Sequence, residues 1–393
     1  WNIIEYWFPC RDLIGGDEWR AALREFVPRV ALAANADAYK LEMLQLIERV
    51  GDSHADLRGW LAARPPVGNY RVPVVVRFIE RELVVTQVAA GAAGRPEELV
   101  VGDVINAIDG VRIEDLVRQL SPYYPASNEP AKRRNMADAI LRCAKPTVLL
   151  ALRRGAEPLS VNVTCVALRE NGSFPRTHDL PGEAFRLLSP EVAYLKLSAV
   201  SQVKLEDCLA RAAGTRGLIV DIRNYPSAFV VFTLGGLLVK QPTEFARFTR
   251  ADLANPGAFR FDAPVKLPPA SRHYDGRVAI LVDEVSQSNA EYTAMALRVA
   301  PGAKVIGSTT AGADGNVSEI LLPGGLRTAI SGIGVFYPDK RPTQRVGIVP
   351  DIEVKPTVAG IRAGRDEVLE AALREILGAE VSEEAIRALV PAR

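Results

Sequence analysis

Histidine is scarce in this chain, with three residues, His54, His178 and His273, among 393. Imidazole is the commonest protein ligand of transition metals, and three scattered histidines do not indicate a metal site. They also restrict the choice of a histidine general base to three positions. The sequence therefore predicts no bound metal, and we expect no organic cofactor.

Cysteine is also infrequent, with four residues at positions 10, 143, 165 and 208. No pair has the C-x-x-C spacing of zinc and redox motifs, so neither function is expected. Cys143 and Cys165 fall within one expected domain and could form a pair. The alternative is that they are buried free thiols, the more common situation for cysteine.

The chain has neither an excess of one charge nor a long apolar run. Its 48 Lys and Arg residues and 47 Asp and Glu residues leave a net charge of +1. This balance indicates no basic surface for nucleic acid. No apolar stretch approaches the roughly 20 residues that span a bilayer, so no transmembrane segment is expected. The chain starts with Trp1, which a removed signal peptide or a trimmed N-terminus would explain.

At 393 residues the chain is long enough for two or three domains with full cores, and its hydrophobic content of 48% is ordinary for a globular protein. Residues 1–67 indicate a small helical domain. Asp17 is expected to cap a first helix and Asp37 a second, which ends at Gly51. Pro65 and Pro66 then interrupt the chain.

Residues 68–170 have a different pattern, typical of a small β-domain. Within it, the segment LVVGDVINAIDGVRI predicts two strands around the Asp109-Gly110 turn. The expected strands are Val72 to Phe78, Leu83 to Val88, Val104 to Ile108, Val148 to Leu152 and Val161 to Val166.

Residues 171–393 alternate between strands and helices, which predicts an α/β layer fold. Pro323-Gly324-Gly325 predicts a turn between strands 317–322 and 326–330. The expected strands are Val192 to Leu197, Gly217 to Ile222, Val278 to Val282 and Lys304 to Gly307, and the expected helices are Leu205 to Ala213, Phe229 to Val239, 289–300, Arg365 to Leu377 and Ser382 to Leu389.

Ser288 stands where the buried strand Val278 to Val282 gives way to an alanine-rich helix. A serine at such a turn can expose its oxygen while the N–H groups that open the helix face developing negative charge. That arrangement is an activated serine with half of an oxyanion hole. The alternative is a structural helix cap at Ser286 or Ser288.

Among the histidines, His54 is the best candidate base because it follows a helix end in the polar turn Gly51 to Ala55. A loop histidine considered alone is more commonly a solvated side chain. His178 lies in a linker that also contains Pro175, and His273 lies in a loop beside Arg272.

Four motifs together resemble the tricorn and C-terminal-processing (tail-specific) serine peptidases. VDEVSQSNAEYTAMALR followed by VIGSTTAGADGN resembles the nucleophile region of that family, and GDSHADL resembles the Ser-His segment of the tricorn branch. GLIVDIRNYPS and GIVPDIEV resemble its D-x-R-x-N-x-G and G-x-x-P-D motifs. The segment around Asp109-Gly110 resembles the signature of PDZ domains. The motifs occur in the family's order and cover nearly the whole chain.

The resemblance assigns roles to individual residues. It implies Ser288 as the nucleophile and His54 as the general base, with Ser53 as the hydroxyl that orients the relay. The oxyanion donors would be the backbone N–H groups of Asn289 and Ser227, because the neighbouring Pro226 has no N–H. Glu291 also matches a family position, for which first-turn support of the helix is as good an explanation as catalysis.

Three positions depart from the family pattern. Ala313 stands where the processing branch has its catalytic lysine, and Lys304 is expected at a strand start, so a Ser-Lys mechanism is rejected. Gln344 stands where the tricorn branch has the relay glutamate, and it carries no charge. The second glycine of the oxyanion loop is absent.

The resemblance implies a three-part serine endopeptidase: an N-terminal helical domain with Ser53-His54, a PDZ-like domain at 68–170 that recruits an extended polypeptide, and a catalytic α/β domain of the crotonase and ClpP type at 171–393. It also implies export to the periplasm or cell envelope. One alternative is an inactive member that binds peptides or apolar ligands in the same cleft. Another is an acyl-CoA enzyme of the crotonase fold, which would not explain the Ser-His segment. The substrate and the oligomeric state are not predicted.

Overall fold

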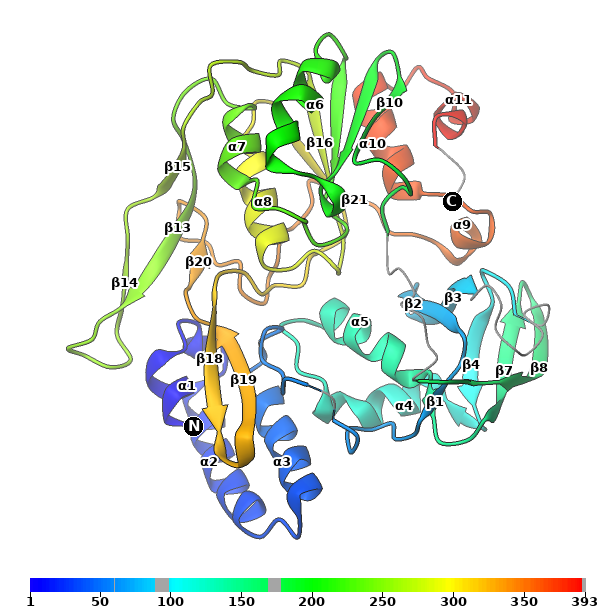
Figure 1. Cartoon of the computed structure of the whole chain (residues 1–393), viewed down its shortest axis with the longest axis vertical. Helices are drawn as coiled ribbons and strands as arrows, with labels where there is room; N and C mark the ends of the chain where they lie inside the picture. The colour runs from blue at the N-terminus through cyan, green and yellow to red at the C-terminus, as the bar shows by residue number, and fades with distance from the viewer. Residues whose placement is uncertain (60, 89–98, 169–177, 391–393) are drawn as a thin grey trace.

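The computed structural model describes residues 1–59, 61–88, 99–168 and 178–390. The chain forms three parts, with the N-terminal helices and a β-domain side by side below a larger α/β part (Figure 1). The expected boundary at 170 and 171 lies outside the described residues. None of the helices in the described ranges is long and apolar enough to cross a membrane.

The centre of the α/β part is a six-stranded sheet with the order β10-β11-β12-β16-β17-β21. Only the β10–β11 pair is antiparallel. The carboxyl ends of β12, β16 and β17 therefore share one edge, where the loops at 222–230, 283–288 and 308–316 lie. The strands are β10 (Phe185–Ser189), β11 (Val192–Lys196), β12 (Gly217–Asp221), β16 (Arg277–Val282), β17 (Lys304–Gly307) and β21 (Ile352–Glu353).

Helices cover both faces of this sheet because its strands are apolar on both sides. One face packs against α6 (Leu205–Ala212), α7 (Val231–Gly236) and α8 (Asn289–Leu297). The other face packs against α10 (Glu367–Leu377), with α9 (Val358–Arg362) and α11 (Glu383–Ala388) nearby (Figure 1). The predicted α/β alternation is confirmed, although α7 and α8 are shorter than expected.

The β-domain contains a sheet of order β2-β3-β4-β7-β8, with β5 paired to β4. The predicted Asp-Gly turn is confirmed, since Asp109 and Gly110 both have positive φ, at 47° and 80°, between β4 and β5. Its elements are β1 (Tyr70–Arg71), β2 (Val74–Ile79), β3 (Glu82–Val88), β4 (Val104–Ile108), β5 (Val111–Arg112), α4 (Ile113–Leu120), α5 (Glu129–Ile140), β6 (Arg142–Cys143), β7 (Thr147–Arg154), β8 (Glu157–Thr164) and β9 (Val166–Ala167).

The N-terminal helices share their core with a hairpin that lies almost 300 positions later in the chain, at residues 317–331. This hairpin joins β18 (Val317–Leu322) to β19 (Leu326–Ser331) through the predicted Pro-Gly-Gly turn. Ile320 and Ile330 pack among the buried residues of the helices. The hairpin therefore fixes the segment that follows the third helix, which contains His54. The helices are α1 (Asn2–Trp7), α2 (Gly16–Ala31) and α3 (Ala36–Glu48).

Two predicted helix caps are wrong. Helix α2 begins at Gly16, so Asp17 lies inside its first turn rather than at its cap. Helix α3 is capped by Asn35, whose side-chain oxygen accepts hydrogen bonds from the N–H groups of Asp37 and Ala38. Asp37 instead supplies negative charge to the first turn, where it also interacts favourably with the helix dipole.

A small side sheet completes the α/β part. Strand β13 (Thr243–Ala251) pairs with β14 (Phe259–Phe261), β15 (Val265–Leu267) and β20 (Val335–Phe336). This sheet projects from the main body beside α7 and α8 (Figure 1).

Candidate active site

Ser288 lies at the strand-to-helix turn after β16 and has an unusual backbone conformation. Its φ is +58° and its ψ is −121°. An ordinary helix cap has an extended backbone, and a non-glycine residue with this φ is strained. A strained strand-to-helix turn is the arrangement that exposes the nucleophilic serine of α/β hydrolases. Ser288 is also the N-cap of α8 in a capping box, in which its side chain accepts from the backbone N–H of Glu291 and the Glu291 carboxylate accepts from the Ser288 N–H. The residue therefore caps the helix, and its positive φ is the feature that an ordinary cap does not have.

Glu291 holds this turn in place from one turn further along α8. Its fully buried carboxylate accepts hydrogen bonds from the N–H groups of Gly312 (2.8 Å), Ala313 (3.0 Å) and Ser288 (3.2 Å), and from the hydroxyl of Thr310. Burial raises the pKa of Glu291, while these hydrogen bonds oppose the rise. Glu291 therefore joins the turn at Ser288 to the loop after β17.

His54 approaches the same turn from the end of the N-terminal helices. The residues that precede the two candidates are in contact, since Gln287 Nε2 donates to Ser53 O at 3.4 Å. His54 is 9% exposed. Burial lowers the pKa of His54, and the nearby Asp52 charge acts in the opposite direction. A neutral imidazole is the form that a general base needs.

The hydroxyl that contacts the His54 ring belongs to Ser331, at the end of β19. Its Oγ lies 2.9 Å from His54 Nδ1 and donates to Asp52 Oδ1 at 3.0 Å. Both Ser331 and Asp52 are buried. The sequence analysis assigns no role to either residue: Asp52 lies within the Ser-His segment, and no spacing connects Ser331 on β19 with that segment.

Ser53 and Gln344, the expected relay residues, contact other groups. Ser53 Oγ accepts from the N–H of Ser127 at 2.8 Å and donates to Ala311 O at 3.3 Å. Gln344 Nε2 donates to Asp52 Oδ1 at 3.3 Å. Gln344 thus supports Asp52, and Ser53 joins the base segment to the β-domain and to the loop after β17.

The two expected oxyanion donors differ in availability. Asn289 is the first residue of α8, so its N–H has no acceptor within the helix. The N–H of Ser227 donates to Leu197 O at 2.9 Å. In this conformation Ser227 therefore cannot donate to an oxyanion unless that hydrogen bond breaks.

The other expected positions lie away from Ser288. Lys304 is exposed at the start of β17, the opposite end of the sheet from the nucleophile turn, and Ala313 is buried beside Glu291. His273 is exposed in a loop. Neither Lys304 nor His273 is placed to act as the base.

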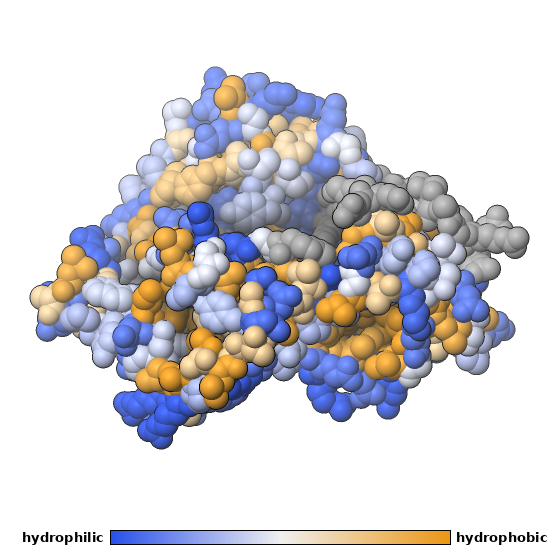
Figure 2. Space-filling view, turned by 60° about the horizontal axis from the view of Figure 1, so that its bottom comes forward, coloured by the Kyte–Doolittle hydropathy of each residue, from blue (hydrophilic) through white to orange (hydrophobic). Residues whose placement is uncertain are grey.

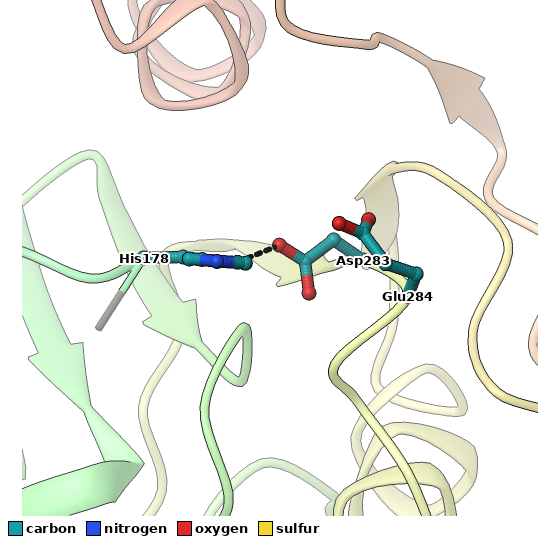
Figure 3. Close-up of side chains that lie close together, drawn as sticks. All are labelled: His178, Asp283 and Glu284. Atoms are coloured by element: carbon teal, nitrogen blue, oxygen red, sulfur yellow. Dashed lines mark hydrogen bonds and ion pairs between the residues drawn. The ribbon is translucent and has the colours of Figure 1, made fainter. Parts of the chain in front are cut away.

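His178 belongs to a separate cluster with Asp283 and Glu284 (Figure 3). Its Nδ1 lies 2.5 Å from Asp283 Oδ2, and one possible ligand atom from each of the three residues lies within 4.8 Å of the others. The guanidinium of Arg77 also contacts both carboxylates, at 3.3 Å from Asp283 and 2.8 Å from Glu284. Since a cation already neutralises these carboxylates, we interpret the cluster as an ion-pair network rather than a metal site.

A cavity of about 1400 Å³ separates the β-domain from the α/β part. Strand β2 and helix α5 form one wall, and Glu284 and Val285, just before Ser288, contribute to the other. The molecule is hollowed between its lobes in the view of Figure 2, where apolar residues also gather over the N-terminal helices. Neither Ser288 nor His54 lines the cavity, but Val285, which does, is three residues before Ser288.

Two arginines of the β-domain contact the segment 283–287, which immediately precedes Ser288. Arg77 on β2 pairs with Asp283 and Glu284. Arg134 on α5 donates to Glu284 O at 2.8 Å and to Gln287 Oε1 at 2.9 Å. Strand β2 and helix α5, which flank the β2–α5 groove of the β-domain, are therefore both connected to the segment that precedes Ser288.

The site therefore consists of an α/β sheet with a serine in a strained strand-to-helix turn and a buried histidine on an adjoining segment. Residues 191–354 match the model of peptidase family S41. This match covers 164 of the 393 residues and includes Ser288 and Gln344, so this part of the chain is similar to the peptidase domain of that family.

Solved structures with low sequence identity share this fold. A mutant of CPAF is 14% identical, with a TM-score of 0.72 over 97% of each chain. Mature CPAF complexed with lactacystin is 13% identical, with a TM-score of 0.70 over 92% of this chain and 93% of that chain. The photosystem II D1 C-terminal processing protease is 16% identical, with a TM-score of 0.51 over 99% and 96%. No curated protein sequence matches the chain.

Proposed function

We propose that the chain is a serine endopeptidase in which Ser288 is the nucleophile and His54 is the general base. The observation that carries the proposal is the backbone of Ser288, with φ +58° at the N-terminus of a helix that follows a buried strand. Ser288 also caps α8, but the capping box needs only an extended backbone, so the positive φ is the feature left for a functional role to explain. The contact between Gln287 and Ser53 supports the pairing of the two residues.

In the proposed reaction, His54 Nε2 accepts the hydroxyl proton as Ser288 Oγ attacks the peptide carbonyl. The tetrahedral intermediate collapses when the imidazolium protonates the leaving amine, and an acyl-enzyme remains. Water then attacks the acyl-enzyme with His54 again as the base, which releases the acid and restores Ser288. The cycle needs no metal.

The oxyanion of the intermediate would accept a hydrogen bond from the N–H of Asn289. A single such donor typically contributes about 10²- to 10³-fold in rate. Ser227 would become a second donor if substrate binding moves the 222–230 loop enough to break the hydrogen bond between its N–H and Leu197 O. We therefore propose that the structure corresponds to a form with an incomplete oxyanion hole.

We further propose that the β-domain is PDZ-like and holds an extended substrate along β2. Strand β2 is the first strand of its sheet, so one edge is not paired within that sheet. A PDZ domain binds peptides by adding a strand at such an edge. Helix α5 flanks this edge, and both elements line the cavity next to Glu284. Export of the chain, expected from the family resemblance, is part of the same proposal.

Labelling with a fluorescent fluorophosphonate tests the catalytic proposal. We expect the wild type to be labelled and both Ser288→Ala and His54→Ala to lose labelling, because the probe reacts only with an activated serine. His273→Ala is the matched control, since this histidine is exposed in a distant loop, and it should label normally. A well-folded wild type that does not react would favour the alternative of a peptide-binding protein without catalysis.

Hydrogen exchange tests the recruitment proposal. In Ser288→Ala an unfolded polypeptide substrate should bind without being cleaved, and a strand added at β2 should slow amide exchange in Val74–Ile79. Strand β8, at the other end of the sheet, is the internal control. Binding with no added protection in β2, or with equal protection in β8, would contradict the proposed groove.

A further inference from the structure

Asp52 lies at the centre of a buried hydrogen-bond network beside the candidate base. Its side chain is fully buried, and Ser331 contributes both its N–H, at 2.6 Å, and its hydroxyl, at 3.0 Å. The backbone N–H of His54 donates to Asp52 Oδ1 at 3.0 Å, and Gln344 Nε2 donates to the same oxygen at 3.3 Å. All four groups donate to the carboxylate, which is the arrangement expected for an ionised acceptor.

The Ser331 hydroxyl has one proton, and its direction determines the protonation of the histidine ring. Because this proton is donated to Asp52, Ser331 Oγ can only accept from His54 Nδ1, 2.9 Å away. A neutral His54 must then have its proton on Nδ1. Its Nε2 then has a free lone pair, and Nε2 is the atom that accepts the proton from Ser288 in the proposed reaction.

We propose that Asp52 and Ser331 are positioning residues that hold His54 as the Nδ1–H tautomer and stabilise its imidazolium form, an inference that rests on the proposed peptidase function. When Nε2 accepts a proton, the new positive charge lies near Asp52, with Nδ1 and Oδ1 3.9 Å apart. No proton passes to Asp52. Ser331 transmits the orientation through its hydroxyl, and the carboxylate acts through its charge.

Among the charged groups near His54, Asp52 is the one that favours the imidazolium form. Asp52 raises the pKa of His54, whereas Arg58 and Arg134 lower it, as burial does. Gln344 is neutral and donates to Asp52, so it supplies no charge of its own. Removing the Asp52 charge should therefore make His54 a weaker base.

Histidine-selective ¹⁵N NMR tests the tautomer independently of catalysis. With three histidines in the chain, the His54 signals can be identified by their loss in His54→Ala. Above the pH at which His54 titrates, we expect the Nδ1–H tautomer in the wild type and a mixture containing Nε2–H in Ser331→Ala. Ser331→Thr retains a hydroxyl and should keep the wild-type tautomer. A wild-type Nε2–H tautomer, or no change in Ser331→Ala, would overturn the proposal.

The rate of fluorophosphonate labelling tests the effect on the nucleophile. We expect Asp52→Asn to slow labelling by ~10²- to 10³-fold, less than the ~10⁴-fold reported for direct carboxylate–histidine pairs, because the contact passes through a hydroxyl. Ser331→Ala should slow it by about 10-fold. Thr328→Val is the matched control, because it removes another buried hydroxyl from β19 and should label like the wild type.

The pH profile separates positioning from a general loss of structure. In Asp52→Asn the acid limb of the labelling rate should move to lower pH, because the imidazolium loses its stabilising charge. Misfolding would lower the amplitude without moving the limb. An unchanged limb together with unchanged rates would overturn the proposal. Complete absence of labelling in the wild type would refute the peptidase function instead, and the NMR tautomer would still decide the role of Asp52 and Ser331.

Discussion

Gln344 Nε2 donates a hydrogen bond to Asp52 Oδ1 at 3.3 Å, and both side chains are buried. The resemblance to the tricorn branch leads one to expect a glutamate at position 344. A glutamate there would place a second carboxylate against Asp52 with no proton to share. The amide is the group that complements an acid already present at position 52. On this interpretation, the negative charge that the tricorn branch has at the position of Gln344 is supplied here by Asp52.

Gln344→Glu should therefore weaken the protein rather than restore a better relay. Two buried carboxylates in contact repel each other unless one keeps a proton, so we expect the free energy of unfolding to fall by ~1–3 kcal/mol at neutral pH. Labelling by fluorophosphonate should slow. Chemical denaturation and labelling rates measure the two effects. Gln344→Met, which removes the hydrogen bond without adding charge, is the control and should lose less stability. Faster labelling in Gln344→Glu would contradict this account.

Asp314 is a second buried acid near the nucleophile turn, and it makes a different prediction. Its Oδ2 lacks a hydrogen-bond partner among the described residues. Burial, with repulsion from Glu291, raises the pKa of Asp314 well above its usual range. The folded state thus retains a proton that the unfolded state releases, so this group reduces stability as pH rises above the ordinary aspartate range.

Asp314→Asn should raise the free energy of unfolding by ~1–2 kcal/mol at pH 8, because the neutral amide removes this cost. The gain should shrink as pH falls toward 4, where an unfolded aspartate is itself protonated. Urea denaturation at several pH values measures the difference. Asp17→Asn, at a side chain 96% exposed, should change stability little at either pH. A gain for Asp314→Asn that is independent of pH would argue for a different cause.

The local structure around Ser288 could be predicted because its signals are contiguous in the sequence. A buried apolar run, a polar turn and an alanine-rich helix occur within residues 278–297, and the structure contains β16, the turn and α8 there. Helices α4 and α5 were not predicted, although Ile113, Val117 and Leu120 have helical spacing and are buried. The β-like runs on either side of these helices obscured that pattern.

The orienting residues of the base could not be found in the same way. Ser331 and His54 are 277 positions apart, and the β18–β19 hairpin brings them together only because Ile320 and Ile330 pack in the core of the N-terminal helices. No periodicity connects such segments. Asp52 was present in the Ser-His motif, two residues before His54, but its orientation depends on Ser331 and Gln344. The Ser227 N–H is likewise occupied by the carbonyl of Leu197, a residue that follows β11 and lies 30 positions earlier in the chain.

The thiols of Cys143 and Cys165 predict a disulfide that forms on oxidation. The two sulfur atoms lie 3.1 Å apart as free thiols. Their shared hydrogen bond lowers the pKa of Cys143, which favours it as the attacking thiolate, and raises that of Cys165. Diamide should therefore reduce the number of titratable thiols in the denatured protein from four to two.

Cross-linking residues that are 22 positions apart should also raise the free energy of unfolding by ~3 kcal/mol. Cys143→Ser should retain all its remaining thiols, and four thiols in the treated wild type would refute the pairing.

Arg77 predicts communication between the β2–α5 groove and the nucleophile turn. Its side chain is largely buried, and the carboxylates of Glu284 and Asp283 raise its pKa against the effect of burial. Arg77→Met retains much of the side-chain volume but leaves these carboxylates without their guanidinium. Because breaking a buried ion pair typically costs ~3–5 kcal/mol, we expect lower stability and a displaced 283–288 turn.

Fluorophosphonate labelling of Arg77→Met should therefore slow by about 10-fold or more, since small displacements of catalytic groups have large effects on rate. Arg118→Ala is the matched control, because this arginine of the same domain is 79% exposed and pairs only locally with Asp115. Labelling should be measured at a temperature at which both variants are folded by circular dichroism. If Arg77→Met loses stability but labels at the wild-type rate, the arginine merely joins the two domains. If it slows labelling while it remains folded, the groove wall contributes to the geometry of Ser288, and a polypeptide bound along β2 can influence the nucleophile through the same side chain.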